Sequence, residues 1–152
     1  MRIISGTHRG RQIFPDKNFT ARPTTDFAKE NLFNVLGNYM DFEGLKALDL
    51  FSGTGSISYE LASRGATEIV AVELNYNHYT FIKRTICELG FKSIRVYKND
   101  TFAACKKLRG QQFNLIFADP PYNLPRIKEV PAAIFDNDLL AEEGIAVIEH
   151  PG

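Results

Sequence analysis

The chain has 152 residues, of which 44% are hydrophobic and 24% are charged, and its formal net charge is zero. This composition suits a cytoplasmic globular protein, and the length suits one domain with a single hydrophobic core. No apolar run approaches the roughly 20 residues of a membrane-spanning helix, no signal-peptide pattern follows Met1, and the two cysteines lie in no metal-binding or disulfide pattern.

The N-terminal residues predict a small hairpin followed by a helix. Segments 2–5 and 11–14 flank a glycine-rich centre, which is typical of a hairpin, and residues 15–23 show no regular pattern. Thr24 or Thr25 would cap a helix that runs to about Met40. Apolar residues at helical spacing predict its buried face, which would contain Ala28, Leu32, Val35, Leu36 and Tyr39.

Strands and helices alternate through the rest of the chain. Short apolar strands are predicted at 46–51, 67–74, 93–100, 113–119 and 144–150. Helices are predicted from the end of the first strand to about 63, at 77–89, at 101–108 and within 126–140. Such alternation, with strands rich in Val, Ile, Leu and Phe, indicates a parallel sheet covered on both faces. We therefore predict a doubly wound α/β domain over residues 1–152.

Charge is distributed unevenly along the chain. Residues 1–25 contain five basic residues against one acid, whereas residues 111–152 contain two basic residues against seven acids. A local basic surface can bind phosphates even on a neutral protein, but a solvated arm has the same composition. Charge alone leaves both interpretations open.

Acidic residues follow the predicted strands. Any one of them can be a helix N-cap or a turn former, but ligands of open α/β sheets bind beyond the carboxyl ends of the strands. Four successive strands bring such a residue to this edge: Asp49, Glu73, Asp100 and Asp119. Together they indicate a ligand site.

The loop SGTGS after the first strand indicates a cofactor that contains a ribose. Gly53 permits a close approach of the ligand, and Glu73 stands twenty residues further on, where an acid can bind ribose hydroxyls. Ser58 replaces the third glycine of the dinucleotide fingerprint, no P-loop lysine follows, and no acid or base for hydride transfer is evident. Asp49 suits a cationic amino group better than a pyrophosphate. S-adenosylmethionine therefore fits better than NAD, and a dehydrogenase is the more distant alternative.

The fourth strand ends in the motif DPPY, residues 119–122. An exocyclic amine is a poor nucleophile because its lone pair is delocalised into the ring. Asp119 and the carbonyl of Pro120, held by the rigid proline backbone, can accept its two N–H groups and return the lone pair to nitrogen. Tyr122 can stack on a flat base. The motif thus predicts methyl transfer to an amine. The alternative and simpler interpretation is a proline turn with a core tyrosine.

The segments DLFSGTGS, VELN, ND and DPPY, in this order, resemble S-adenosylmethionine-dependent methyltransferases of exocyclic amines. More narrowly, RIISGTHRGRQI, RPTTDFAKENLFNVL, LDLFSGTGSISYELASRGA and FADPPY resemble the bacterial family that methylates a guanine N2 in small-subunit ribosomal RNA. The resemblance implies a Rossmann-like class I methyltransferase, without a metal, that acts as a monomer on rRNA in a small-subunit particle.

The resemblance also implies roles for individual residues. The methionine part of the cofactor would contact Asp49, Phe51, Gly53 and Gly55. The ribose and adenine would contact Glu73, Leu74, Asp100 and Thr101. The guanine would be bound by Asp119, Pro120, Pro121 and Tyr122. The basic extension at 1–23 and the start of the core at 24–152 would contact RNA through Arg9, Arg11, Arg22, Thr24 and Thr25.

Members of this family continue beyond the fifth strand with a strand hairpin, whereas this chain ends at IEHPG. We therefore expect the fifth strand to form an exposed apolar edge of the sheet. Two other functions remain open. One is methylation of a DNA or protein amine by the same D-P-P-Y loop, and the other is non-catalytic RNA binding during ribosome assembly on the same fold.

Overall fold

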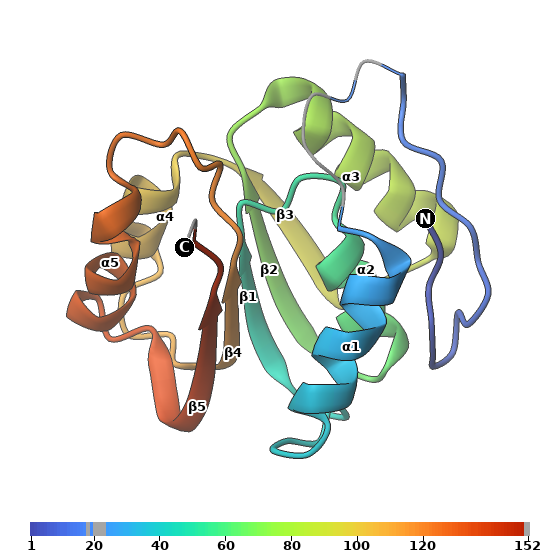
Figure 1. Cartoon of the computed structure of the whole chain (residues 1–152), viewed down its shortest axis with the longest axis horizontal. Coiled ribbons are helices and arrows are strands. Elements are labelled where there is room, and N and C mark those ends of the chain that lie inside the picture. Colours follow the sequence, from blue (N-terminus) through green and yellow to red (C-terminus); the bar gives the residue numbers. More distant parts are fainter. Residues whose placement is uncertain (18, 20–23, 151–152) are drawn as a thin grey trace.

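A computed structural model describes residues 1–17, 19 and 24–150. Five parallel strands form one sheet in the order β3-β2-β1-β4-β5 (Figure 1). The strands are β1 Lys46–Leu50, β2 Glu68–Glu73, β3 Ile94–Lys98, β4 Phe113–Ala118 and β5 Leu140–Ile148. The strand order reverses between β1 and β4, and a crevice for ligands forms at such a switch point.

Helices cover both faces of the sheet, as the alternating pattern predicted. One face carries α1 Asp26–Leu36, α2 Ser56–Ser63 and α3 Tyr76–Leu89 (Figure 1). The other carries α4 Thr101–Lys107 and α5 Val130–Asp136, the latter preceded by a 3₁₀ turn, Ile127–Glu129. Side chains of a strand alternate between the two cores, so that Ala47 packs with the first group and Leu48 with the second. The doubly wound α/β prediction is confirmed.

The predicted N-terminal hairpin is present in a shortened form, centred on an antiparallel bridge between Arg2 and Gln12. The N–H of Ile3 donates to the Arg11 carbonyl at 2.9 Å, and the N–H of Ile13 donates to the Met1 carbonyl at 2.8 Å. The backbone N–H groups of Ile4 and Ser5 donate to the carboxylate of Glu60 in α2, at 2.8 and 3.1 Å, instead of to a neighbouring strand. The hairpin ladder therefore stops before Ile4, and a buried side chain takes the place of the partner strand at Ile4 and Ser5.

Helix α1 begins where the sequence predicted and ends four residues earlier. The Thr25 hydroxyl caps it by accepting from the N–H of Ala28 at 3.1 Å, and it ends at Leu36. The predicted apolar face is partly wrong, because Val35 is 56% and Tyr39 is 74% exposed. Leu36 is buried as predicted, and the helix also buries Lys29 and Phe33, which were not on the predicted face.

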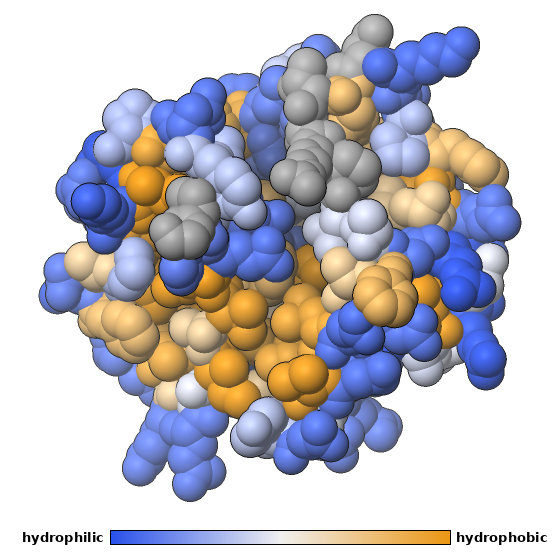
Figure 2. Space-filling model, viewed as in Figure 1, coloured by the Kyte–Doolittle hydropathy of each residue, from blue (hydrophilic) through white to orange (hydrophobic). Residues whose placement is uncertain are grey.

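Strand β5 lies at the edge of the sheet and begins at Leu140, four residues earlier than predicted. Its pairing with β4 shifts in register between Phe113 and Leu115, which lets the additional residues join the strand. Ile145 and Val147 are only partly buried. Figure 2 shows apolar residues gathered on the face of the molecule around β5 and β4, so the expected apolar edge is present.

Candidate cofactor and substrate site

A cavity of about 940 Å³ opens beyond the carboxyl ends of the strands. Its wall includes the segments that follow β1, β2, β4 and β5, together with the first residues of α1 and α4. It brings together most of the predicted site residues: Thr24, Thr25, Asp49, Phe51, Gly53, Glu73, Leu74, Asp100, Thr101, Asp119, Pro120, Pro121 and Tyr122. Residues predicted to hold a cofactor and residues predicted to hold a base therefore share one space.

The glycine loop is fixed by its own backbone conformation and by Glu73. Gly53 and Gly55 have positive φ angles, which glycine adopts without strain. Phe51 also has a positive φ angle, which is uncommon for a residue with a side chain. The N–H of Gly53 donates to Glu73 Oε1 at 2.7 Å. A Cβ atom on Gly55 would lie 2.5 Å from the ring of Tyr59. Gly55 does not line the cavity, so packing against Tyr59 accounts for this glycine.

Glu73 joins the loops that follow β1 and β2. Its second oxygen accepts from the N–H of Asn75 at 2.8 Å, and Nδ1 of His78 lies 3.8 Å away. The carboxylate is thereby held in one orientation at the cavity wall. A residue placed in this way can present its remaining acceptor sites to a ligand hydroxyl.

Asp49 is a buried acid with a matched donor. It is 1% exposed, and the hydroxyl of Ser58 donates to its Oδ2 at 2.7 Å. Burial raises the pKa of Asp49 to about 7, although the Ser58 hydrogen bond opposes this change. Sequence reasoning used Ser58 only to disfavour a dinucleotide. The structure gives it a positive role as the partner of Asp49, which a hydroxyl in the first turn of α2 could have suggested.

Two of the predicted site residues also cap helices. The Asp100 carboxylate accepts from the N–H of Ala103 at 3.0 Å and begins α4, as Thr25 begins α1. The interpretation of an acid after a strand as a helix N-cap is therefore correct for Asp100. Both residues line the cavity as well, so capping places them at the site.

The D-P-P-Y motif forms a turn at the cavity wall. Pro120 is buried, and the carbonyl of Pro121 accepts from the N–H of Leu124 at 3.0 Å. Among the described residues, no backbone N–H donates to the Pro120 carbonyl. Tyr122 is 56% exposed and lines the cavity. The interpretation of Tyr122 as a core residue is therefore wrong.

Glu149 is a site residue that sequence reasoning missed. It follows β5, its N–H donates to the Ala118 carbonyl at 2.9 Å, and its side chain lines the cavity. Its carboxyl group lies close enough to that of Asp119 for the two to interact. Partial burial, followed by the charge and the hydrogen bond of Asp119, raises the pKa of Glu149. The signal was present, because the fifth strand also ends on an acid, as the first four do.

The predicted RNA-contacting residues divide into two groups. Thr24 and Thr25 line the main cavity. Arg9 and Arg11 are exposed and lie outside it, and Arg11 lines a second cavity of about 480 Å³ beside α3. Arg22 lies outside the described residues.

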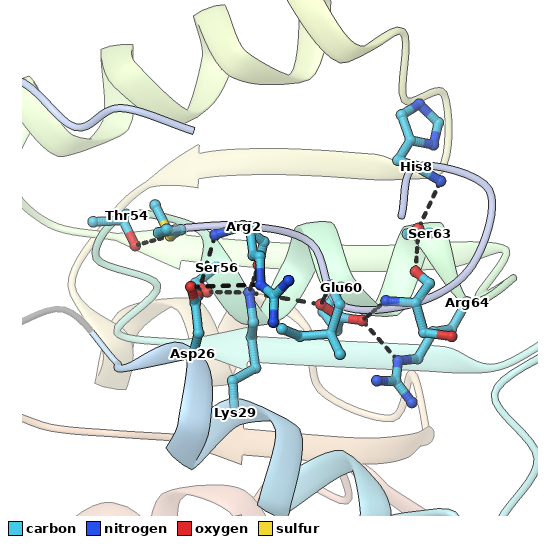
Figure 3. Close-up of polar contacts among 12 residues, drawn as sticks. Arg2, His8, Asp26, Lys29, Thr54, Ser56, Glu60, Ser63 and Arg64 are labelled. Atoms are coloured by element: carbon cyan, nitrogen blue, oxygen red, sulfur yellow. Dashed lines mark hydrogen bonds and ion pairs between the residues drawn. The ribbon is translucent and has the colours of Figure 1, made fainter. Parts of the chain in front are cut away.

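A buried ionic cluster, which the sequence did not reveal, fastens the N-terminal segment to the site (Figure 3). The ammonium group of Lys29 donates to the Arg2 carbonyl at 2.6 Å and to the Ser56 hydroxyl at 3.1 Å, and lies 3.6 Å from Glu60. Arg64 donates to the other Glu60 oxygen at 2.8 Å. Since Ser56 begins α2 directly after the glycine loop, this cluster connects residues 1–5, α1 and that loop.

Neither a metal centre nor a membrane segment is found among residues 1–17, 19 and 24–150. Within those ranges, no group of three or more His, Cys, Asp or Glu side chains is arranged to hold a metal ion. The helices that they form are also too short or too polar to cross a membrane.

Comparison with known proteins places the chain in a family. A family model described as conserved hypothetical protein 95 matches residues 1–152. The Bacillus subtilis protein named "Putative rRNA methyltransferase YlbH" is 37% identical over 99% of this chain and 82% of its own length. Ribosomal RNA small subunit methyltransferase D of Buchnera aphidicola is 30% identical over 99% of this chain and 76% of its own length.

A solved structure agrees with these relatives. The Escherichia coli protein described as "Putative methyltransferase yhhF" superposes with a TM-score of 0.89 at 28% identity, over 100% of this chain and 81% of that one. The predicted Rossmann-like methyltransferase fold is thus confirmed. The chain belongs to the conserved hypothetical protein 95 family, to which its relatives among the small-subunit rRNA methyltransferases also point.

Proposed function

We propose that this protein methylates ribosomal RNA, and that it transfers a methyl group from S-adenosylmethionine to the exocyclic N2 of a guanine in the small-subunit RNA. The observation that carries the proposal is the cavity in which the strand-end acids meet the D-P-P-Y turn. The names of the Bacillus subtilis and Buchnera aphidicola relatives support methyl transfer to rRNA. The choice of guanine N2 rests on the motifs that resemble the family of guanine methyltransferases.

The loops after β1 and β2 would hold the methionine and ribose parts of S-adenosylmethionine, which supplies an electrophilic methyl group when bound. Asp49 would pair with the cationic amino group, since a positive charge beside a buried carboxylate favours its ionised form. Glu73, already oriented by Gly53 and Asn75, would accept hydrogen bonds from ribose hydroxyls.

The adenine would lie between β2 and α4. Leu74 is 63% exposed at the cavity wall, which suits an apolar contact with a flat ring. Asp100 and Thr101 begin α4 on the opposite side and would contact the adenine amino group. Apolar packing on the ring with a polar contact at its edge is the usual arrangement in ligand pockets.

The D-P-P-Y turn would hold and activate the guanine. Asp119 and the Pro120 carbonyl would accept the two N–H groups of the amine and favour a pyramidal nitrogen with an available lone pair. Tyr122 would stack on the base and fix its plane. As the N–C bond forms and the S–C bond breaks, Asp119 would stabilise the positive charge on nitrogen, and a carboxylate of the site would take the released proton.

The N-terminal extension would bind RNA at a distance from the target base. Arg9 and Arg11 are exposed outside the cavity, so they would contact phosphates of neighbouring nucleotides and not the guanine itself. The ionic cluster around Glu60 would hold this extension in place relative to the cofactor loop. We propose that a monomer, with 1–23 as the RNA-contacting extension and 24–152 as the catalytic core, performs the reaction.

The experiment measures methyl transfer from labelled S-adenosylmethionine to unmodified bacterial small subunits, with mass spectrometry of the digested RNA. N2-methylguanosine is expected. Calorimetry should show binding of S-adenosylmethionine and none of NAD. A chain that binds RNA but neither binds the cofactor nor transfers methyl groups would be the assembly protein of the alternative hypothesis.

The role of Asp119 has its own test. Asp119→Ala should lower the methylation rate about a hundredfold or more, because an electrostatic contact made in the transition state is lost. Asp136→Ala, a matched change at an exposed position at the end of α5, should leave the rate unchanged. A rate for Asp119→Ala equal to that of the parent refutes the assignment.

A further inference from the structure

Asp119 and Glu149 form a pair of acids at the ends of adjacent parallel strands. Ala118 in β4 is in register with Ile148 in β5, so the next residue of each strand projects from the same edge. The N–H of Glu149 donates to the Ala118 carbonyl at 2.9 Å, which extends the pairing by one residue and fixes the Glu149 backbone. The two carboxyl groups lie close enough for Asp119 to raise the pKa of Glu149, and both residues line the cavity.

The pair offers more acceptors than an amine alone requires. Asp119 and the Pro120 carbonyl are sufficient for the two N–H groups of an exocyclic amine. Glu149 adds a further carboxylate beside Asp119, on the side of β5 and facing the same cavity as Tyr122. Glu149 is exposed in the free protein, so water can satisfy its carboxylate. Once a bound base covers this carboxylate, it needs a donor on that base, because a buried acceptor without a donor is costly.

Guanine is the base whose pairing edge provides that donor. Its N1–H lies directly beside the N2 amine, so the edge presents adjacent donors. Adenine and cytosine place an unprotonated ring nitrogen next to their amine, and this acceptor would face the carboxylate and be repelled. Sites built to hydrogen-bond one group discriminate strongly against analogues that lack it.

We propose that Glu149 selects guanine by accepting the N1–H, while Asp119 and the Pro120 carbonyl accept the hydrogens of the N2 amine. This inference deepens the proposed function and rests on it. Glu149 is thus a specificity-determining residue that contacts the substrate base. Guanine would give each of the two neighbouring carboxylates a donor of its own.

The test compares Glu149→Gln with the parent on two RNAs. Mass spectrometry of reconstituted small subunits treated with the parent protein first identifies the modified guanosine. The first RNA keeps this guanosine, and the second RNA carries adenosine at the same position. Glutamine has the shape of glutamate but no charge, and its amide can donate to the adenine N1. Glu142→Gln, the same change at an exposed position outside the cavity on the same strand, is the matched control.

Glu149→Gln should lower kcat/KM for the guanosine RNA about 10- to 100-fold, which is the effect of losing a charged hydrogen bond. It should also raise N6-methyladenosine formation on the second RNA, so that the preference for guanosine over adenosine falls by more than the loss on guanosine alone. The melting temperature and the affinity for S-adenosylmethionine should stay close to those of the parent, and Glu142→Gln should behave as the parent throughout.

The outcomes separate the two proposals. If the parent forms N2-methylguanosine and Glu149→Gln keeps both its rate and its base preference, the role of Glu149 is refuted while the proposed function stands. A lower rate with an unchanged preference also refutes selection by Glu149. If the parent forms no N2-methylguanosine on either RNA, the proposed function fails and the inference fails with it.

Discussion

Replacing Lys29 with methionine tests whether the buried ionic cluster holds the N-terminal segment to the core. The Lys29 side chain is 1% and the Glu60 side chain 0% exposed, and the ammonium group donates to two further oxygens. Methionine fills a similar volume without the charge. The change leaves Glu60 with Arg64 and the N–H groups of Ile4 and Ser5 as partners, but removes its cation from α1.

Breaking one side of a buried ion pair typically costs 3–5 kcal/mol, and because Arg64 still faces Glu60 we expect the lower end, about 3 kcal/mol. For a chain of this size, 1 kcal/mol shifts the melting temperature by roughly 2–4 °C, so Lys29→Met should melt about 6–12 °C below the parent. Differential scanning calorimetry measures the shift. Lys92→Met, the same change at an exposed position, should melt within about 2 °C of the parent.

A double-mutant cycle distinguishes the pair from general damage to the core. Lys29→Met combined with Glu60→Gln should cost less than the sum of the two single changes, because the second change removes the negative charge that lost its Lys29 partner in the first. Strict additivity would show that Lys29 and Glu60 do not interact. A melting temperature of Lys29→Met within 2 °C of the parent would refute the structural role of the cluster altogether.

Two further changes alter charged groups, one in the cavity and one outside it. Burial holds the pKa of Asp49 at about 7, above its ordinary value of 3.8, so its contribution to stability is full below pH 4 and is lost as the pH rises through 7. Chemical denaturation can measure how much more stable the parent is than Asp49→Asn at each pH. This difference in the free energy of unfolding should fall between pH 4 and pH 7. A difference that stays constant with pH would contradict the raised pKa. Replacing both Arg9 and Arg11 with alanine should weaken RNA binding and flatten its dependence on salt, with cofactor affinity retained. Equal RNA affinity in a filter-binding titration would remove these two residues from the interface.

Much of the fold could be predicted because its signals are local. Each strand of a covered parallel sheet is apolar on both faces, so its position is visible in a short window, and the intervening helices follow. The acids at the strand ends could also be placed together, since parallel strands deliver their carboxyl ends to one edge. The N-cap at Thr25 was predictable for the same reason, because a cap and the N–H that it accepts lie three residues apart.

The face of α1 was less predictable because it depends on distant residues. The pattern of apolar side chains favoured Val35 and Tyr39, yet both are exposed, while Lys29 is buried. Burial of a lysine needs partners that neutralise it, and these come from Glu60, Ser56 and the Arg2 carbonyl. No window around Lys29 contains them.

The sequence by itself determined the α/β architecture, the edge at which the site lies and the chemical character of its residues, because these follow from periodicity and from the types of side chain at the strand ends. Only the tertiary structure decided which of those residues touch. It joined Ser58 to Asp49 and Glu149 to Asp119, because strand register and helix packing bring together groups that lie far apart along the chain.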